Sequence, residues 1–301
     1  MKKFLSGLMA GAMLFGVLTL AGCGDTTTDT GEDTTTTEDT TTTAEFTTVT
    51  EGVLTMSTNA AFPPYEMTDD SGNIVGIDAE IAAAIAEKLG LELQIDDMDF
   101  DGALAAPQSG KSDIVMAGVT VNEERQLVLD FSNTYANGVQ KVIVAEGSDI
   151  TMENLGEQQI GTQKGTTGNI LTTDEFGEDH VIAYDDAIAA VQALNNGQID
   201  CVVIDSAVAD NLVEANPGLT TLDTDYANEE DAIGVAKGNP ALLDAINTAL
   251  QELIDDGTVQ SIIDKYIPTD GTAADEAGTT DEAGATDEAG ATDGAEADTA
   301  A

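Results

Sequence analysis

Positive charge is the property that this sequence has least of. Its 301 residues include 57 aspartates and glutamates but only 9 lysines and arginines, so the formal net charge at pH 7 is −48. Because phosphate backbones and anionic lipid surfaces repel such a chain, we predict no nucleic-acid binding. The one arginine, Arg125, lies in the stretch AGVTVNEERQLVLDFS. An isolated arginine is usually a solvated surface residue, so its role depends on its surroundings.

Cysteine and histidine are nearly as scarce, with Cys23, Cys201 and His180 as the whole set. Cys201 lies in the apolar run IDCVVID, which is typical of a buried core residue rather than of a nucleophile. The sequence shows no cluster of metal-ligating residues and no cysteine–histidine arrangement for nucleophilic catalysis. We therefore predict no metal site, no cofactor and no catalytic residues, that is, a protein that is not an enzyme.

The first 23 residues, MKKFLSGLMAGAMLFGVLTLAGC, have the features of a secretory signal. Lys2 and Lys3 precede an apolar segment, and small residues lead up to Cys23. This ending resembles the bacterial lipoprotein box, in which the cysteine is lipidated and becomes the mature N-terminus. An ordinary signal peptide with a chance cysteine is the alternative. The resemblance implies an extracytoplasmic protein, anchored to a bacterial cell membrane by acyl chains on Cys23.

Beyond this signal, both ends of the chain are of low complexity. Residues 24–50 are rich in threonine, aspartate and glutamate, and we predict a disordered tether. Residues 269–301 repeat DEAG units, and we predict a disordered acidic tail. The remaining stretch, 51–268, is long enough for one compact domain or two small ones.

Strand-like and helix-like segments alternate through residues 51–268, which predicts an α/β fold with mainly parallel sheets. DAEIAAAIAEKLG predicts a helix with Asp78 as its N-cap and Gly90 at its end. Asn122 is placed to cap the helix that contains Arg125. In open α/β sheets, ligands lie outside the carboxyl ends of the strands. The loops TNAAFPPYE, AGVTVNEER, GTQKGTTGN and VIDSA are therefore candidates for a binding site.

Four motifs occur in order: TNAAFPPYEMTDDSGNIVGIDAEIAAAIAEKLG, MDFDGALAAPQSGKSDIVMAGVTVNEERQLVLDFSNTY, GTQKGTTGN and ALNNGQIDCVVIDSAVA. They resemble the extracellular solute-binding proteins, family 3, which serve ABC importers of polar amino acids, and the resemblance covers residues 51–267. It implies a periplasmic-binding-protein-like type II fold, with two α/β lobes joined by two hinge strands and a ligand cleft between them. Lobe 1 would comprise 51–138 and 231–268, and lobe 2 would comprise 139–230. Pro107 stands where the family usually has leucine, and proline kinks or ends a helix.

A free amino acid carries a carboxylate and an ammonium on one carbon, and a buried site must pair both charges. The resemblance implies that Arg125 grips the carboxylate, because a planar guanidinium meets it with two parallel hydrogen bonds. It implies that Asp205 pairs with the ammonium, a role that is compatible with capping the following helix. Gly118 would offer its carbonyl to the ammonium, and Thr120 its N–H or hydroxyl to the carboxylate.

The resemblance implies further contacts from both lobes. Thr167, at a predicted helix N-terminus, would reach the carboxylate from lobe 2 when the lobes close. Phe62 and Phe100 would sandwich the ligand's side chain, with core packing as their alternative role. Three more residues, Asn59, Glu66 and Gln163, lie at positions where family members vary their contacts with the ligand's side chain or support the pocket.

Reversible binding without chemistry is the function that the resemblance implies. A monomer would capture a free polar amino acid in the cleft, close about its hinges and deliver the ligand to the permease subunits of an ABC importer. Two alternatives belong to other classes. One is an enzyme of the same fold, similar to cyclohexadienyl or arogenate dehydratase, and the other is a sensory ligand-binding domain. Glutamine, arginine, lysine, histidine and cystine all stay open as ligands.

Overall fold

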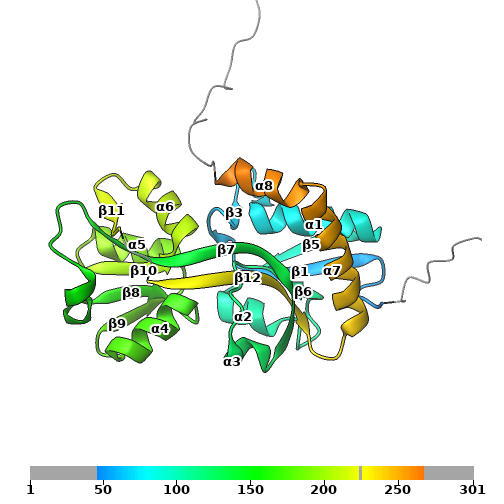
Figure 1. Ribbon diagram of the computed structural model, residues 1–301, viewed down its shortest axis with the longest axis horizontal. Helices are drawn as coiled ribbons and strands as arrows, with labels where there is room; N and C mark the ends of the chain where they lie inside the picture. Colours follow the sequence, from blue (N-terminus) through cyan, green and yellow to red (C-terminus); the bar gives the residue numbers. More distant parts are fainter. Residues whose placement is uncertain (1–45, 224–225, 268–301) are drawn as a thin grey trace, which may run out of the picture. The chain divides into compact units, whose positions relative to one another are not determined.

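A computed structural model describes residues 46–223 and 226–267 of the chain (Figure 1). The predicted signal segment with Cys23 lies outside the described residues, as do positions 24–45 of the predicted tether and the predicted acidic tail (269–301).

The last residues of the predicted tether, 46–50, contact the folded part of the chain. Phe46 packs against the apolar core, and the Val49 N–H donates to Asp113 Oδ1 at 2.7 Å. Within the described residues, every helix is too short or too polar to span a lipid bilayer.

Helices and strands alternate along the described residues, as the sequence predicts. The helices are α1 (Ile77–Leu89), α2 (Phe100–Ala105), α3 (Glu123–Gln126), α4 (Thr167–Phe176), α5 (Ala187–Asn195), α6 (Ser206–Ala215), α7 (Pro240–Asp255) and α8 (Thr258–Tyr266), with a 3-10 helix at Met152–Glu157. The strands are β1 (Val53–Thr58), β2 (Ala61–Phe62), β3 (Glu66–Thr68), β4 (Ile74–Val75), β5 (Glu92–Asp97), β6 (Ile114–Val115), β7 (Leu129–Ala145), β8 (Ile160–Gln163), β9 (Val181–Tyr184), β10 (Cys201–Asp205), β11 (Leu219–Thr221) and β12 (Ala227–Ala236).

The strands of the described residues form one large mixed sheet and one small antiparallel sheet. The large sheet has the order β5-β1-β6-β12-β7-β10-β8-β9, with β11 paired to β7, and the small sheet consists of β2, β3 and β4. β1 runs parallel to β5 and β6, and β8 runs parallel to β9 and β10. Between these two parallel groups, β7 and β12 run antiparallel to each other and to their outer neighbours. The prediction of mainly parallel sheets is corrected accordingly, because the chain passes between the groups along β7 and returns along β12.

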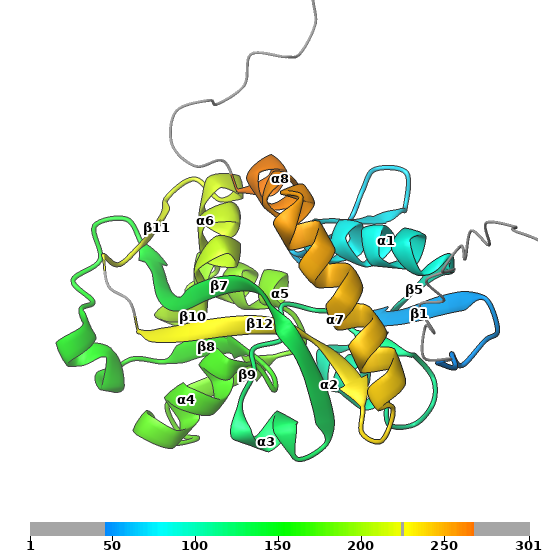
Figure 2. The ribbon, with the colours of Figure 1, turned by 45° about the vertical axis from the view of Figure 1, so that its right-hand side comes forward.

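β7 and β12 cross the middle of the fold side by side (Figures 1 and 2). β7 has 17 residues and β12 has 10. The stretch 136–140, which contains one implied crossing between the lobes, pairs here with 227–231, which contains the other, with Glu229 opposite Gly138. This two-stranded ribbon links the parts of the chain that carry the four candidate loops.

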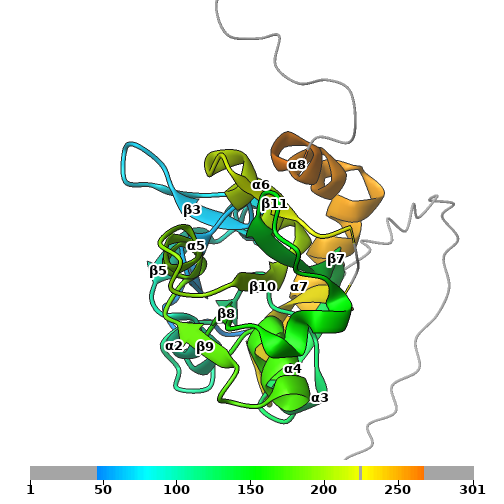
Figure 3. The same ribbon diagram turned by 90° about the vertical axis from the view of Figure 1, so that its left-hand side faces the viewer.

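β10 is covered by apolar side chains on both faces, as the run IDCVVID predicts. Val202 and Ile204 join a large cluster that includes α5 and α6, whereas Cys201 and Val203 join a second cluster on the other face. Figure 3 shows α5 and α4 on opposite sides of β8 and β10. Cys201 is fully buried, which confirms its place in the core, and burial, with Asp200 as a smaller cause, raises its pKa to about 12.

Asp78 does not cap α1, which corrects the prediction. Gly76 occupies the cap position, where an added Cβ would lie 2.2 Å from the Tyr65 carbonyl oxygen, and Asp78 is fully buried in the first turn. Its carboxylate accepts from the Gly118 N–H at 2.9 Å and from the Tyr135 hydroxyl at 2.7 Å. Gly118 and Tyr135 lie 40 and 57 residues from Asp78 along the chain, so the local sequence could not reveal these hydrogen bonds.

Other helix boundaries follow the sequence. Gly90 ends α1 in the left-handed conformation with φ 68°, and the Asn122 side chain accepts the Arg125 N–H at 2.8 Å. α2 ends at Ala105, so Pro107 lies beyond the helix and introduces no kink. Helices α1, α7 and α8 pack side by side, as Figure 2 shows.

Candidate ligand-binding pocket

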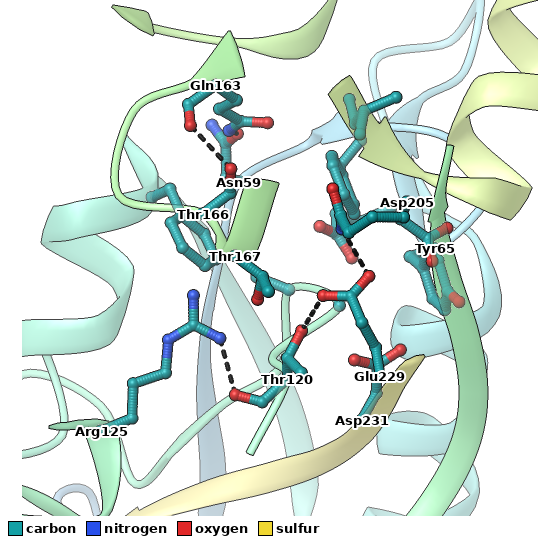
Figure 4. Close-up of a pocket in the computed structure, with 17 residues that line it drawn as sticks. Asn59, Tyr65, Thr120, Arg125, Gln163, Thr166, Thr167, Asp205, Glu229 and Asp231 are labelled. Atoms are coloured by element: carbon teal, nitrogen blue, oxygen red, sulfur yellow. Dashed lines mark hydrogen bonds between the residues drawn. The ribbon is translucent and has the colours of Figure 1, made fainter. Parts of the chain in front are cut away.

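The nine residues predicted as ligand contacts line one pocket of about 420 Å³ (Figure 4). They are Asn59, Phe62, Phe100, Gly118, Thr120, Arg125, Gln163, Thr167 and Asp205. The pocket lies where the loops after β1, β6, β8 and β10 meet, in agreement with the rule that ligands bind outside the carboxyl ends of strands.

Arg125 is held in the pocket wall by neutral groups. Its side chain is 6% exposed, Nη1 donates to the Thr120 carbonyl at 2.6 Å, and Nη2 donates to the Gly165 carbonyl at 3.2 Å. The guanidinium carbon lies 5.3 Å from the centre of the Phe100 ring. None of the ion pairs found among the described residues includes Arg125. Burial lowers its pKa, but a guanidinium stays cationic in proteins, so this charge is available to an anion.

The N-terminus of α4 lies beside this guanidinium, as Figure 4 shows for Thr167 and Arg125. The Thr166 side chain caps the helix by accepting the Asn169 N–H, and the Thr167 hydroxyl is buried without a hydrogen-bond partner. Unpaired N–H groups at a helix N-terminus favour negative charge. The arginine and the helix end therefore form a common site for an anion.

Asp205 lies across the pocket from Arg125, and its two carboxylate oxygens have different surroundings. Oδ1 caps α6 by accepting the N–H groups of Ala207 and Val208, at 2.8 and 3.2 Å. Oδ2 is buried and accepts no hydrogen bond from the described residues. Burial, followed by the charge of Glu229, raises the pKa of Asp205 to about 7. One oxygen is thus committed to the fold, and the other is free for a cation.

The Glu229 carboxylate accepts hydrogen bonds from two neighbouring side chains of the pocket. Oε1 accepts from the Thr120 hydroxyl at 2.7 Å, and Oε2 accepts from the Gln140 amide. Of the two donors expected from Thr120, the hydroxyl is therefore already in use, which leaves its backbone N–H. Gly118 donates its N–H to Asp78, and an added Cβ there would lie 2.8 Å from the Phe62 ring.

Asn59 and Gln163 bond to each other across the pocket. Gln163 Nε2 donates to Asn59 Oδ1 at 2.9 Å, and both side chains are buried. The next residue after Gln163, Lys164, forms a surface ion pair with Asp101 at 2.7 Å. Together with the bond from Arg125 to Gly165, these contacts join the loop after β8 to the opposite wall of the pocket.

The remaining lining residues were not predicted as contacts, apart from Glu66, which the sequence marks only as a variable or supporting position. They are Tyr65, Glu66, Ala117, Gln140, Thr166, Ile204, Glu229 and Asp231. The sequence held a signal for Glu229 and Asp231, because residues two positions apart on a strand project to the same face. Which face would meet the pocket depends on the pairing of β12 with β7, which the sequence does not encode locally.

Two further carboxyl groups of the lining are buried, and their pKa values are raised. Burial, followed by Asp205 and Glu229, raises the pKa of Asp231 well above its ordinary value. Burial, followed by Asp78, does the same for Glu66. Within residues 46–223 and 226–267, no group of three or more acidic, histidine or cysteine side chains is arranged to hold a metal ion.

Comparison with known proteins identifies the class to which this fold and pocket correspond. The family of bacterial extracellular solute-binding proteins, family 3, matches residues 54–269, and the chain belongs to this family.

Individual relatives fit this assignment. The chain is 31% identical over 230 residues to a probable histidine-binding protein of Neisseria gonorrhoeae, covering 74% of this chain and 85% of the relative. It is 31% identical over 225 residues to the L-cystine-binding protein TcyJ of Escherichia coli (strain K12), covering 73% and 85%. A crystal structure of a mutant of ArgBP from T. maritima superposes with a TM-score of 0.69 at 37% identity, covering 72% of this chain and 96% of that one.

Proposed function

We propose that this protein binds a free polar amino acid in the pocket and delivers it to the permease of an ABC importer. The observation that carries the proposal is a buried cation and a buried carboxyl group in one pocket, each without a partner of opposite charge. Arg125 is a buried guanidinium without an ion-pair partner, and Asp205 presents a buried carboxylate oxygen without a donor. The zwitterionic head of an amino acid supplies both missing partners at once.

In this proposal, each wall of the pocket has its own role. Arg125, the Thr120 N–H and the N-terminus of α4 with Thr167 receive the α-carboxylate. Asp205 Oδ2 and the Gly118 carbonyl receive the α-ammonium. The rings of Phe62 and Phe100, which are almost fully buried beside these groups, enclose the start of the ligand's side chain.

Opening and closing about the β7 and β12 ribbon would let the ligand enter and leave. The proposed lobes are residues 51–138 with 231–268, and residues 139–230. The contacts of the loop after β8 with the opposite wall are those expected of a closed form.

The proposal extends to location and partners. The sequence MKKFLSGLMAGAMLFGVLTLAGC supports export and lipid attachment at Cys23, which would keep the protein beside its permease on the outer side of a bacterial cell membrane. Relatives named as histidine- and cystine-binding proteins support binding rather than catalysis.

Calorimetric titration of the chain from residue 24 onward with the twenty amino acids and cystine tests the proposal. We expect micromolar or tighter binding of a few polar amino acids, and loss of that binding in the Arg125→Ala variant. Absence of binding by every amino acid would overturn the proposal. Turnover of prephenate or arogenate would instead favour a dehydratase of the same fold.

A further inference from the structure

The pocket contains more carboxyl groups than a zwitterion can use. Its lining carries those of Glu66, Asp205, Glu229 and Asp231 but only the one guanidinium of Arg125. In the proposed function, the ligand's α-groups pair with Arg125 and Asp205. Glu229 needs no further partner, because both of its oxygens accept hydrogen bonds from neighbouring side chains. Glu66 and Asp231 are left without a positive partner.

Of these two acids, Glu66 lies beside the ligand's side chain rather than beside its α-groups. Glu66 stands directly opposite Phe62 in the pairing of β2 with β3, and opposite residues of an antiparallel pair project to the same face. Phe62 encloses the side chain in the proposed function. Asp231, in contrast, is coupled most strongly to Asp205, at the end that receives the ammonium.

Glu66 shares a proton with Asp78. Glu66 is fully buried, and neither of its oxygens accepts a hydrogen bond from a donor among the described residues. Its carboxyl group is instead in hydrogen-bonding contact with Asp78. Asp78 already accepts from Gly118 and Tyr135, which favours its ionised form. A hydrogen bond between two carboxyl groups requires one proton, so Glu66 donates and Asp78 accepts.

The groups that surround Glu66 add no positive charge. Asp78 from α1, Asp231 from β12 and Asp97 from β5 act on it, and Tyr135 from β7 is coupled to the same pair. No ion pair among the described residues includes Glu66. Burial and these acids raise the pKa of Glu66 well above its ordinary value. These surroundings favour the neutral form of the side chain in the empty pocket, and a cation beside it would favour the ionised form.

We propose that the pocket selects an amino acid whose side chain ends in a positive charge, and that Glu66 receives this charge by giving up the proton that it shares with Asp78. The proton passes to the solvent buffer, and the ionised Glu66 pairs with the ligand's side chain. This inference rests on the proposed function and adds to it the class of side chain and the residue that recognises it. A ligand with a neutral side chain gives Glu66 no cation, so Glu66 then keeps its proton.

Arginine and citrulline form the matched pair of ligands that tests the inference, since they have nearly the same shape and differ in side-chain charge. Titration calorimetry near neutral pH, in two buffers of different ionisation enthalpy, counts the protons released on binding. Ionisation of Asp205 contributes equally to both ligands. We expect the wild-type protein to bind arginine about 10- to 100-fold more tightly than citrulline, and to release about one proton more with arginine.

The Glu66→Gln variant keeps the size of the side chain and a donor for Asp78 but cannot ionise. We expect its affinity for arginine to fall toward that for citrulline, and the extra proton to disappear. Glu230→Gln makes the same chemical change at an exposed position of β12 and should alter neither quantity. Melting temperatures of both variants show whether the fold is kept.

The possible outcomes separate the two proposals. Equal binding of arginine and citrulline without an extra proton would overturn this inference and leave the proposed function standing. A preference for arginine that survives in Glu66→Gln but is lost in Asp231→Asn would also overturn it, by moving the role to Asp231. Binding of no amino acid at all would overturn both. The wild-type proton count decides the matter even where Glu66→Gln does not fold.

Discussion

The two ends of the pocket hold buried charge in different ways. At one end, two carbonyl oxygens and an aromatic face fix the guanidinium of Arg125, and it stays charged in the empty protein. At the other, acidic end, Glu66, Asp205 and Asp231 have pKa values raised by burial and by neighbouring acids. Arginine cannot escape burial by losing its proton, whereas a carboxylate can by gaining one. In the two proposals, the cationic end is therefore always ready for an anion, and the acidic end becomes charged when a cation arrives.

Removing Arg125 should have the largest effect, because it breaks the end that is permanently charged. In Arg125→Ala, the ligand's carboxylate would be buried without its main partner, at a cost of about 3–5 kcal/mol. This corresponds to a loss of about two to four orders of magnitude in affinity, measurable by calorimetry. Arg125→Lys keeps the charge but not the two parallel hydrogen bonds, so it should bind with intermediate affinity. Undiminished binding by Arg125→Ala would remove the basis of the comparison.

Neutralising Asp205 should have the next largest effect. Asparagine is a good N-cap, so Asp205→Asn should keep α6 and should not lower the melting temperature of the empty protein. It cannot supply a full negative charge to the ammonium, and the loss of a buried charge pair costs about 2 kcal/mol or more. We expect affinity for every amino acid to fall by about 30-fold or more. A variant that lost its fold together with its binding would show that the cap is the dominant role of this residue.

The stability of the empty protein should depend on pH because of the acidic end. A carboxyl group whose pKa is raised on folding stabilises the fold below its unfolded pKa, near 4, and this contribution is lost as pH rises through the folded value. The folded values are about 6 for Asp78, raised by burial, and about 7 for Asp205. The melting temperature without ligand should therefore fall by several degrees as pH rises from about 4 to 7. Calorimetric scans would check this, and Asp205→Asn should show a weaker dependence.

The surface pair beside the pocket should have the smallest effect. Lys164 and Asp101 form an ion pair at 2.7 Å, but both side chains are about half exposed to solvent. Because water and salt screen such pairs, Lys164→Ala should change ligand affinity by less than about twofold, and added salt should abolish the difference. A larger loss would mean that this contact, rather than the two charged ends, controls closure of the loop after β8.

Much of the candidate site could be predicted because the motifs carry their own local structure. Asn122 caps the helix of Arg125 three residues away, and Asp205 caps α6 in the same manner. The glycines and polar residues that follow strands mark the loops that meet at the pocket. All nine predicted contacts line it for this reason.

Other features depended on contacts between distant parts of the chain. Asp78 has the sequence signature of a helix cap, yet its carboxylate bonds to Gly118 and Tyr135. The sequence predicts Asn59 and Gln163 as ligand contacts. In the structure, the Gln163 amide donates a hydrogen bond to Asn59, which lies 104 residues away along the chain. The antiparallel course of β7 and β12 likewise follows from how the chain returns between the two parallel groups.

The sequence alone determined the family and the alternation of strands and helices, and it singled out the lone arginine as a candidate binding residue. Those properties reside in short motifs whose spacing and chemistry are fixed along the chain. The tertiary structure decided the balance of charge in the pocket, because burial and proximity set it, and both depend on residues far apart in sequence. Only folding brings Glu66 against Asp78 and places Glu229 and Asp231 in the same wall, and so raises the pKa values of Glu66 and Asp231.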